Sequence, residues 1–180
     1  MTDVFDEGKA RAAEAFTRET RPLTPDGAAA MRNKAAETVR EMELSAGYFV
    51  VFDRERFQLT SEAYGNAKEA NARMALLKAE TALNYQRSTR LMKEYIEKRG
   101  LDRTNFGDLI RTLFGGGVAF FQDRELKIFA GVAAFSGGTE LQDEEVCVRA
   151  ITAAGLHADI PPVVPQVLQE ALQVPQAPQG

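Results

Sequence analysis

The stretch from Phe114 to Ala150 constrains the fold most, because glycine turns in it separate segments of two different periodicities. Gly115–Gly117 lead into the apolar run Val118–Phe121, and glycine gives the backbone the freedom for a tight turn into a strand. After a polar break, Leu126–Phe135 is rich in β-branched and aromatic residues, which is typical of a buried strand. The pattern predicts an antiparallel hairpin.

A helix is predicted directly after this hairpin. Ser136–Gly138 end the second strand, and Thr139 with Gln142 has the spacing of a capping box. Asp143–Glu145 then fall in the first turn, where negative charge stabilises a helix N-terminus. An acid/base pair of Asp143 and Glu144 is the alternative, but adjacent helical residues do not face each other. We therefore favour stabilisation of the helix start.

Upstream of this stretch, the sequence predicts further helices and another hairpin. Thr24 and Pro25 have the form of an N-cap and a first helical residue. Apolar residues then recur every three or four positions at Ala28, Met31, Ala35, Val39 and Met42, which predicts an amphipathic helix that ends near Gly47. Tyr48–Phe52 and Phe57–Thr60 form the predicted hairpin. A long helix should run from Asn66 to Tyr85, with its inner seam formed by Ala67, Ala70, Met74, Leu77 and Thr81.

A shorter helix should follow, with Leu91, Met92, Tyr95 and Ile96 on its inner face and Gly100 at its end. Further short helices are expected at Val4–Thr17, from Thr104 through Leu113, and at Gln166–Gln173. Prolines interrupt the chain after Gly155 and exclude one continuous helix there. We divide the chain into an N-terminal helical extension (1–23), a central domain (24–156) and a proline-rich tail (157–180).

Length and charge limit the class of protein. A chain of 180 residues, 44% hydrophobic and 27% charged, is large enough for one ordinary core. A net charge of -4 argues against nucleic acid or an anionic membrane as a partner. The single Cys147 excludes an internal disulfide, and we find neither a secretory leader nor a membrane-spanning apolar run. These features predict a cytoplasmic protein.

Three sequence segments resemble the GlcG/HbpS-like family, which includes heme-binding proteins and the C-terminal domain of some cobalamin adenosyltransferases. They are YFVVFD from Tyr48, KAETALNYQRST from Lys78, and GGGVAFF followed by GVAAFSGGTELQDEEV. The resemblance covers about residues 24–156. It implies an α+β fold in which an antiparallel sheet packs against helices in a profilin-like layout. It also implies a symmetric oligomer and a site for heme or another small ligand.

The glycine turns and the helix beside them are the predicted ligand site, because backbone amides near a helix start bind polar ligands. The predicted ligand-binding residues are Lys78, Thr81, Ser136, Gly137, Gly138, Thr139 and Asp143. Tight turns required by the fold are the alternative interpretation of the glycines. His157 has no second metal ligand at a suitable spacing, so a surface imidazole is expected, and Cys147 is expected to be buried.

We find no complete set of catalytic residues, and the sequence leaves both enzyme activity and any metal open. Some relatives bind heme through a histidine in the N-terminal helical region, whereas the only histidine here is His157. Tyrosine, methionine and cysteine are alternative heme ligands, and the sequence does not select among them. The leading hypothesis is an oligomeric protein that binds a small molecule, with heme as the most concrete ligand, in a catabolic pathway. The alternative is a noncatalytic subunit of a catabolic enzyme such as an aromatic-ring oxygenase.

Overall fold

The computed structural model describes residues 23–101 and 112–161. In this part of the chain, five antiparallel strands form one sheet in the order β2-β1-β4-β3-β5. The strands are β1 (Ala46–Asp53), β2 (Gln58–Gly65), β3 (Gly117–Phe121), β4 (Phe129–Ser136) and β5 (His157–Ala158). The helices are α2 (Pro25–Glu41), α3 (Glu69–Tyr85), α4 (Thr89–Lys98) and α5 (Glu140–Ala153). The predicted α+β class is confirmed.

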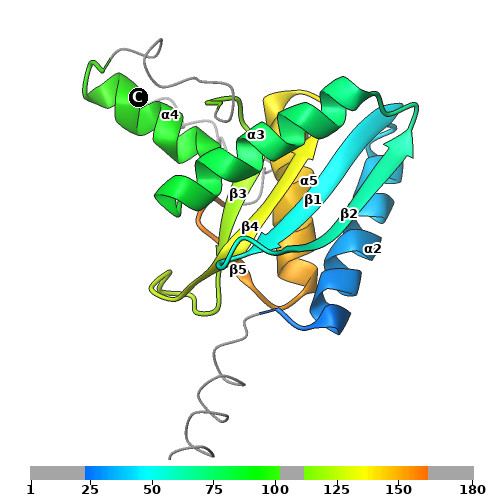
Figure 1. Ribbon diagram of the computed structural model, residues 1–180, viewed down its shortest axis with the longest axis horizontal. Helices are drawn as coiled ribbons and strands as arrows, with labels where there is room; N and C mark the ends of the chain where they lie inside the picture. Colours follow the sequence, from blue (N-terminus) through cyan, green and yellow to red (C-terminus); the bar gives the residue numbers. More distant parts are fainter. Residues whose placement is uncertain (1–22, 102–111, 162–180) are drawn as a thin grey trace, which may run out of the picture.

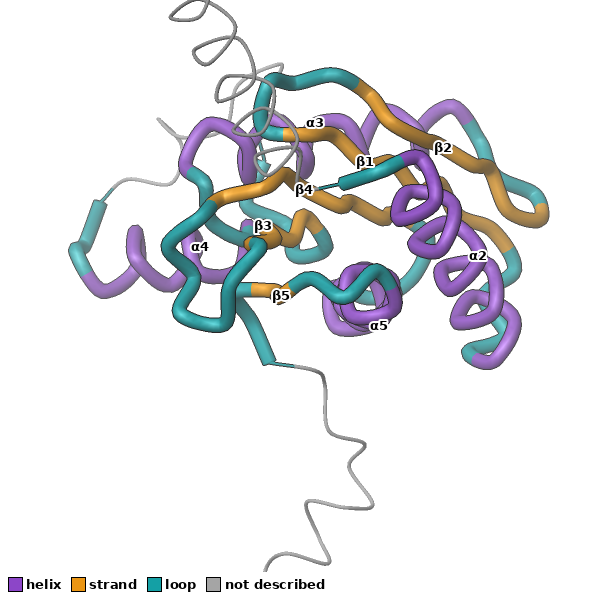
Figure 2. Tube along the Cα trace, turned by 90° about the horizontal axis from the view of Figure 1, so that it is seen from below, coloured by secondary structure: helices purple, strands orange, loops and turns teal. Residues whose placement is uncertain are grey.

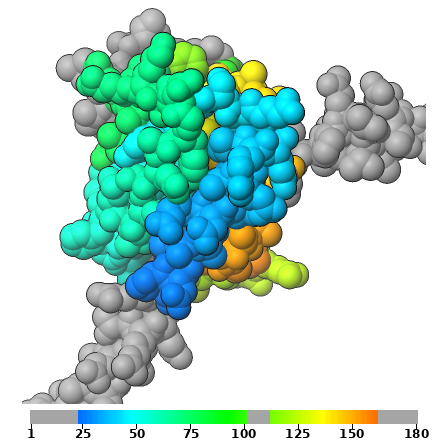
Figure 3. All heavy atoms as spheres, turned by 90° about the vertical axis from the view of Figure 1, so that its right-hand side faces the viewer, coloured from blue at the N-terminus to red at the C-terminus, as the bar shows by residue number. Residues whose placement is uncertain are grey.

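Helices cover both faces of the sheet. Figure 1 shows α3 in front of the strands and α2 with α5 behind them, and Figure 2 shows the same layers from below. In Figure 3, α2 lies between the α3 side of the molecule and the end of α5. Alternate residues of β1 serve the two layers, because Phe49 and Val51 join the core under α2 and α5 while Val50 joins the core under α3.

The predicted start of α2 is confirmed. The Thr24 side chain accepts a hydrogen bond from the amide of Gly27, and Pro25 is the first helical residue. Of the predicted apolar positions, Ala28, Met31, Ala35 and Val39 are buried. The predicted end of the helix near Gly47 is wrong, because α2 ends at Glu41 and Gly47 lies in β1. The end of α4 at Gly100 is as predicted, since this glycine has a φ of 62° after the last helical turn.

The predicted inner seam of α3 is confirmed at Thr81 but is otherwise displaced by about one residue. Its buried residues are Ala75, Lys78, Ala79, Thr81, Ala82 and Leu83, whereas Ala70 is exposed and Met74 and Leu77 are half-buried. The helix also begins at Glu69 rather than Asn66. The small residues face the sheet because the backbones of α3 and β3 lie very close together: a Cβ on Gly117 would lie 2.5 Å from the Lys78 carbonyl oxygen. Only the alanine-rich face lets α3 lie so near the sheet.

Both hairpins are confirmed, although β4 begins at Phe129 rather than Leu126. Leu126 has a φ of 56°, and the Asp123 carboxylate accepts hydrogen bonds from the amides of Lys127 and Ile128. These residues therefore form the turn. Leu156 and Ile160 are buried, and His157–Ala158 pair with β3, so the chain packs on the sheet beyond residue 156.

The helices predicted at Val4–Thr17 and Gln166–Gln173 lie outside the described residues, as does Thr104. No helix in the described ranges 23–101 and 112–161 is long and apolar enough to cross a membrane.

Candidate functional site

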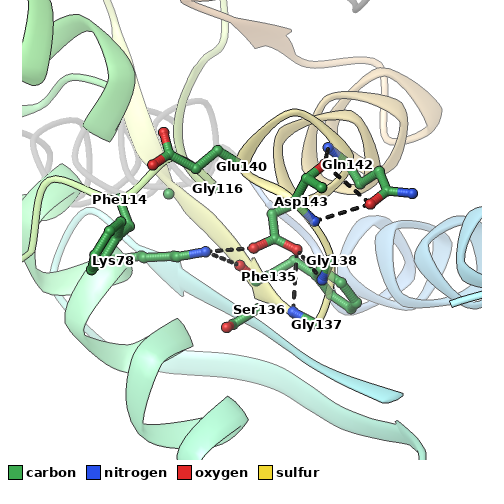
Figure 4. A network of polar contacts seen from close by, with 12 residues as sticks. Lys78, Phe114, Gly116, Phe135, Ser136, Gly137, Gly138, Glu140, Gln142 and Asp143 are labelled. Carbon is green, nitrogen blue, oxygen red and sulfur yellow. Dashed lines mark hydrogen bonds and ion pairs between the residues drawn. The ribbon is translucent and has the colours of Figure 1, made fainter. Parts of the chain in front are cut away.

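A buried ion pair joins α3 to the start of α5. The Lys78 Nζ lies 2.6 Å from Asp143 Oδ2 and also donates to the carbonyl of Phe135 at 3.1 Å. Both residues are only 2% exposed. Burying such charges is costly unless they are paired and hydrogen-bonded, and here both conditions are met. Figure 4 shows the lysine reaching from α3 to the carboxylate across the end of β4.

The second oxygen of Asp143 organises the turn between β4 and α5. Asp143 Oδ1 accepts hydrogen bonds from the amides of Gly137 at 3.1 Å and Gly138 at 2.8 Å (Figure 4). The amides of Gly137 and Gly138, which were predicted to donate to a ligand, therefore donate to Asp143 instead. Burial raises the pKa of the Asp143 carboxyl, whereas Lys78 and the two glycine amides act in the opposite direction.

The predicted capping box of α5 is present. The Thr139 side chain accepts a hydrogen bond from the amide of Gln142, and the Gln142 side chain accepts one from the amide of Thr139 at 3.0 Å. Thr139, Gly137 and Gly138 are exposed, so this turn is accessible from solvent beside the buried ion pair.

The first glycine turn packs directly against the ion pair. Gly116 has a φ of 107°, and a Cβ there would lie 2.6 Å from the Asp143 Cβ and 3.0 Å from the Lys78 Nζ. Figure 4 shows Gly116 beside these two side chains. A Cβ on Gly115 would lie 2.8 Å from Glu144 Oε1. Side chains at these positions would displace the ionised groups, so the glycines are needed for close approach.

Thr81 and Ser136 form hydrogen bonds that hold the segments around the ion pair in place. The Thr81 hydroxyl donates to the Leu77 carbonyl at 3.0 Å and accepts from the amide of Thr112 at 2.8 Å, so it holds the segment that enters the glycine turn. The Ser136 carbonyl accepts from the Asn71 side chain at 3.3 Å. The structure therefore gathers most predicted site residues at one end of β4, with Thr81 one helical turn from Lys78.

A second charged cluster, absent from the predicted ligand-binding set, lies between α4 and α5. Lys93 Nζ is 3.3 Å from Glu140 Oε2, and Arg90 Nη1 is 3.4 Å from Glu144 Oε2. The Glu144 side chain is 2% exposed, and burial raises its pKa to about 7, with Glu140 adding to the rise and Arg90 opposing it. Within the described ranges, Glu144 Oε2 and Arg90 Nε are buried without a hydrogen-bond partner.

The spacing of charged residues in the sequence indicates which members of this cluster share a helix face. Glu140 and Glu144 are four residues apart and Arg90 and Lys93 three apart, so each pair occupies one face of its helix. Nothing in the sequence says that these two faces meet. The burial of Asp143–Glu145, at 5% exposure or less, also goes beyond the expected stabilisation of a helix start.

Cys147 and His157 lie apart from the exposed part of this region. Cys147 is buried as predicted, its Sγ lies 3.5 Å from the Gly116 carbonyl oxygen, and burial raises its pKa well above the ordinary value. His157 is half-buried and pairs with Phe121, at the end of the sheet away from Ser136. Among residues 23–101 and 112–161, no group of three or more histidine, cysteine or acidic side chains is arranged to hold a metal ion.

The fold and this junction define an α+β domain with helices on both faces of an antiparallel sheet. The family model described as haem degrading protein HbpS-like matches residues 23–152. The chain therefore belongs to the HbpS-like family, as its sequence segments had indicated.

Solved structures agree with this assignment of the fold. The PduOC:heme complex superposes with a TM-score of 0.65 at 20% identity, over 75% of this chain and 96% of that one. Klebsiella pneumoniae protein ORFY gives 0.63 at 22% identity, over 74% and 90% of the two chains. HbpS gives 0.61 at 17% identity, over 72% and 88%. None of the curated proteins matches the chain.

The residues beside the glycine turns do not fit a heme held by histidine or thiolate. The only histidine of the chain is at the other end of the sheet, and the Cys147 thiol is buried with a raised pKa. A ligand bound beside Lys78 and Asp143 would instead meet carboxylates, cations and backbone groups.

Proposed function

We propose that this chain is a small-molecule-binding protein and that its ligand lies beside the two glycine turns. The observation that carries the proposal is the concentration of buried charge there, with Lys78, Asp143 and Glu144 each at most 2% exposed. Buried ion pairs contribute little net stability, and ionisable groups with shifted pKa values are concentrated at functional sites. Family membership supports the same function.

In this proposal the predicted residues have two roles. Gly137–Thr139 form the accessible turn that faces the ligand, whereas Ser136, which is buried, and Lys78, Thr81 and Asp143 are positioning residues beneath it. Lys78 and Asp143 hold the glycine turns in place, and Thr81 holds the approach to the first turn through Thr112. We assign no catalytic residue.

Native mass spectrometry of the purified protein tests this function. We expect an added mass on the wild-type chain that is released on denaturation and is reduced in a Lys78→Met, Asp143→Leu double variant. Lys34→Met is the control, because Lys34 pairs with Glu37 on the outer face of α2. Wild-type protein with no added mass from any cell extract would refute the proposal.

Heme is the specific ligand to test first, because the neighbour PduOC was solved as a heme complex. A heme ligated by histidine in this chain requires His157 and therefore a position at the β3–β5 edge. Titration of heme into wild-type protein and His157→Ala, followed by the Soret band, distinguishes the two sites. A band that persists in the variant would exclude His157 as the ligand, and no band in either protein would remove heme.

We further propose that the chain acts in the cytoplasm as an oligomer in a catabolic pathway. Phe57, Leu126 and Ile128 are 69%, 37% and 47% exposed, and both hairpin turns that carry them lie at the same end of the sheet (Figure 1). We propose that these three side chains form one contact surface, since large exposed apolar patches mark sites of protein interaction. Light scattering of the chain alone tests a homo-oligomer, and co-expression with neighbouring gene products tests the alternative, an accessory subunit of a catabolic enzyme.

A further inference from the structure

A cavity of about 740 Å³ lies at the end of the sheet away from the glycine turns. The residues that line it come from the β3–β4 turn, the C-terminal half of α5 and the segment around β5. Figures 1 and 2 show β5 between α5 and the loop that joins β3 to β4. The lining includes the apolar residues Val148, Leu156 and Ile160. A cavity of this size with a partly apolar lining is typical of a site for a small organic molecule.

The Arg124 side chain lines this cavity and has no hydrogen-bond or ion-pair partner in the described part of the chain. Its charged neighbours in the β3–β4 turn are engaged. The Asp123 carboxylate accepts hydrogen bonds from the amides of Lys127 and Ile128, and the Lys127 ammonium pairs with Glu125. Arg124 is exposed, so its guanidinium is available to a molecule that enters from solvent.

The His157 imidazole lines the same cavity, and it too makes no hydrogen bond or ion pair among residues 23–101 and 112–161. His157 pairs with Phe121 at the end of β3, and Arg124 follows in the turn just beyond. An imidazole offers a ring N–H donor in either tautomer. Guanidinium and imidazole donors on one cavity favour a ligand that carries an anionic oxygen.

Acceptor groups in the cavity wall are already bonded within the protein. Asp159 lines the cavity, and its carboxylate oxygens accept from the Ser88 amide at 2.8 Å and from the Ser88 hydroxyl. At the end of α5, the Thr152 carbonyl accepts from the Gly155 amide at 3.0 Å. The Thr152 hydroxyl donates to the Val148 carbonyl at 2.9 Å. These acceptors, which would repel an anion, are therefore engaged, whereas the two donors are not.

We propose that this cavity binds a small carboxylic acid with an apolar body. The Arg124 guanidinium pairs with the carboxylate, because its planar N–H groups match the two oxygens. The His157 ring N–H donates to the same carboxylate, and the apolar body lies against the apolar lining of the cavity. This second site is separate from the one beside the glycine turns and goes beyond the proposed function. The alternative is a solvated arginine beside a surface groove that binds no ligand.

The single histidine of the chain makes a direct test possible, because its ring signals in an NMR spectrum report on this cavity alone. Hexanoate and 1-hexanol are titrated into the untagged full chain at constant pH, since these probes have the same chain length and differ in the head group. We expect hexanoate to shift the His157 signals saturably, with an affinity about tenfold higher than that of 1-hexanol. A charge-assisted hydrogen bond has an effect of this size.

Arg124→Gln should reduce the preference for hexanoate to about twofold or less, because the guanidinium is lost. Arg54→Gln is the matched control: it removes the same charge from the β1–β2 turn at the same end of the sheet, where Arg54 pairs with Glu55 at 2.7 Å. The control should keep the tenfold preference. No saturable shift, equal affinity for the two probes, or equal effects of the two substitutions would overturn the inference. The site beside the glycine turns is tested separately by its own double variant, so either proposal can fail without the other.

Discussion

The Lys78 ammonium and the Asp143 carboxylate lie 2.6 Å apart in the interior, joined across a distance of 65 residues in the sequence. The pair connects α3 to the turn that begins α5, and the Gly115–Gly117 segment packs over it. The position of the candidate site therefore depends on this one contact.

Replacing one member of the pair should destabilise the protein strongly. Lys78→Met leaves the Asp143 carboxylate buried without its cation, which costs about 3–5 kcal/mol of unfolding free energy. The Lys78→Met, Asp143→Leu double variant should recover a large part of that loss, because no unpaired charge remains. Urea denaturation at neutral pH measures both. A single variant within about 0.5 kcal/mol of wild type would show that the pair is not structurally important.

Gly116→Ala should lower the unfolding free energy by more than the penalty for a positive φ alone. Gly116 and Gly100 both have positive φ, at 107° and 62°, but a Cβ at Gly100 would meet nothing within 4 Å. Gly100→Ala should therefore cost about 1–2 kcal/mol, the penalty for the backbone conformation. Gly116→Ala adds a contact at 2.6 Å with Asp143 and should cost at least about twice as much. Equal midpoints in thermal or urea denaturation would argue against the close packing.

The protein should lose stability as the pH rises toward neutrality and above. The pKa of Glu144 is raised from 4.5 to about 7 in the folded chain, so between these values the folded state binds more protons than the unfolded state. Unfolding free energy should fall across this window, by about 3 kcal/mol if Glu144 acts alone. The groups that act on its charge are Arg90 from α4, Lys78 from α3, and Glu140 and Asp143 from α5.

Glu144→Gln checks that assignment, because glutamine cannot ionise. The variant should show a smaller decrease in stability between pH 5 and pH 8 than the wild type, whereas Glu145→Gln should keep the wild-type dependence. Urea denaturation at the two pH values gives both slopes. An unchanged slope in Glu144→Gln would assign the pH dependence to another group.

Sequence reasoning predicted the local structure better than the long-range contacts. Thr24, Gly100 and the Thr139–Gln142 capping box act within a few residues of their own position, so each is readable from spacing alone. The sequence predicts Lys78 as a ligand-binding residue, but its burial against Asp143 depends on how α3 lies on the sheet. The Arg90–Glu144 contact is harder still, since it requires knowing that α4 faces the start of α5.

A crystal structure of the protein purified without added ligand tests the central claim most directly. We expect non-protein electron density against the exposed turn formed by Gly137–Thr139. Ligand density confined to His157 and the β3–β5 edge, or a fully resolved Gly137–Thr139 turn with only water beside it, would contradict the proposed site.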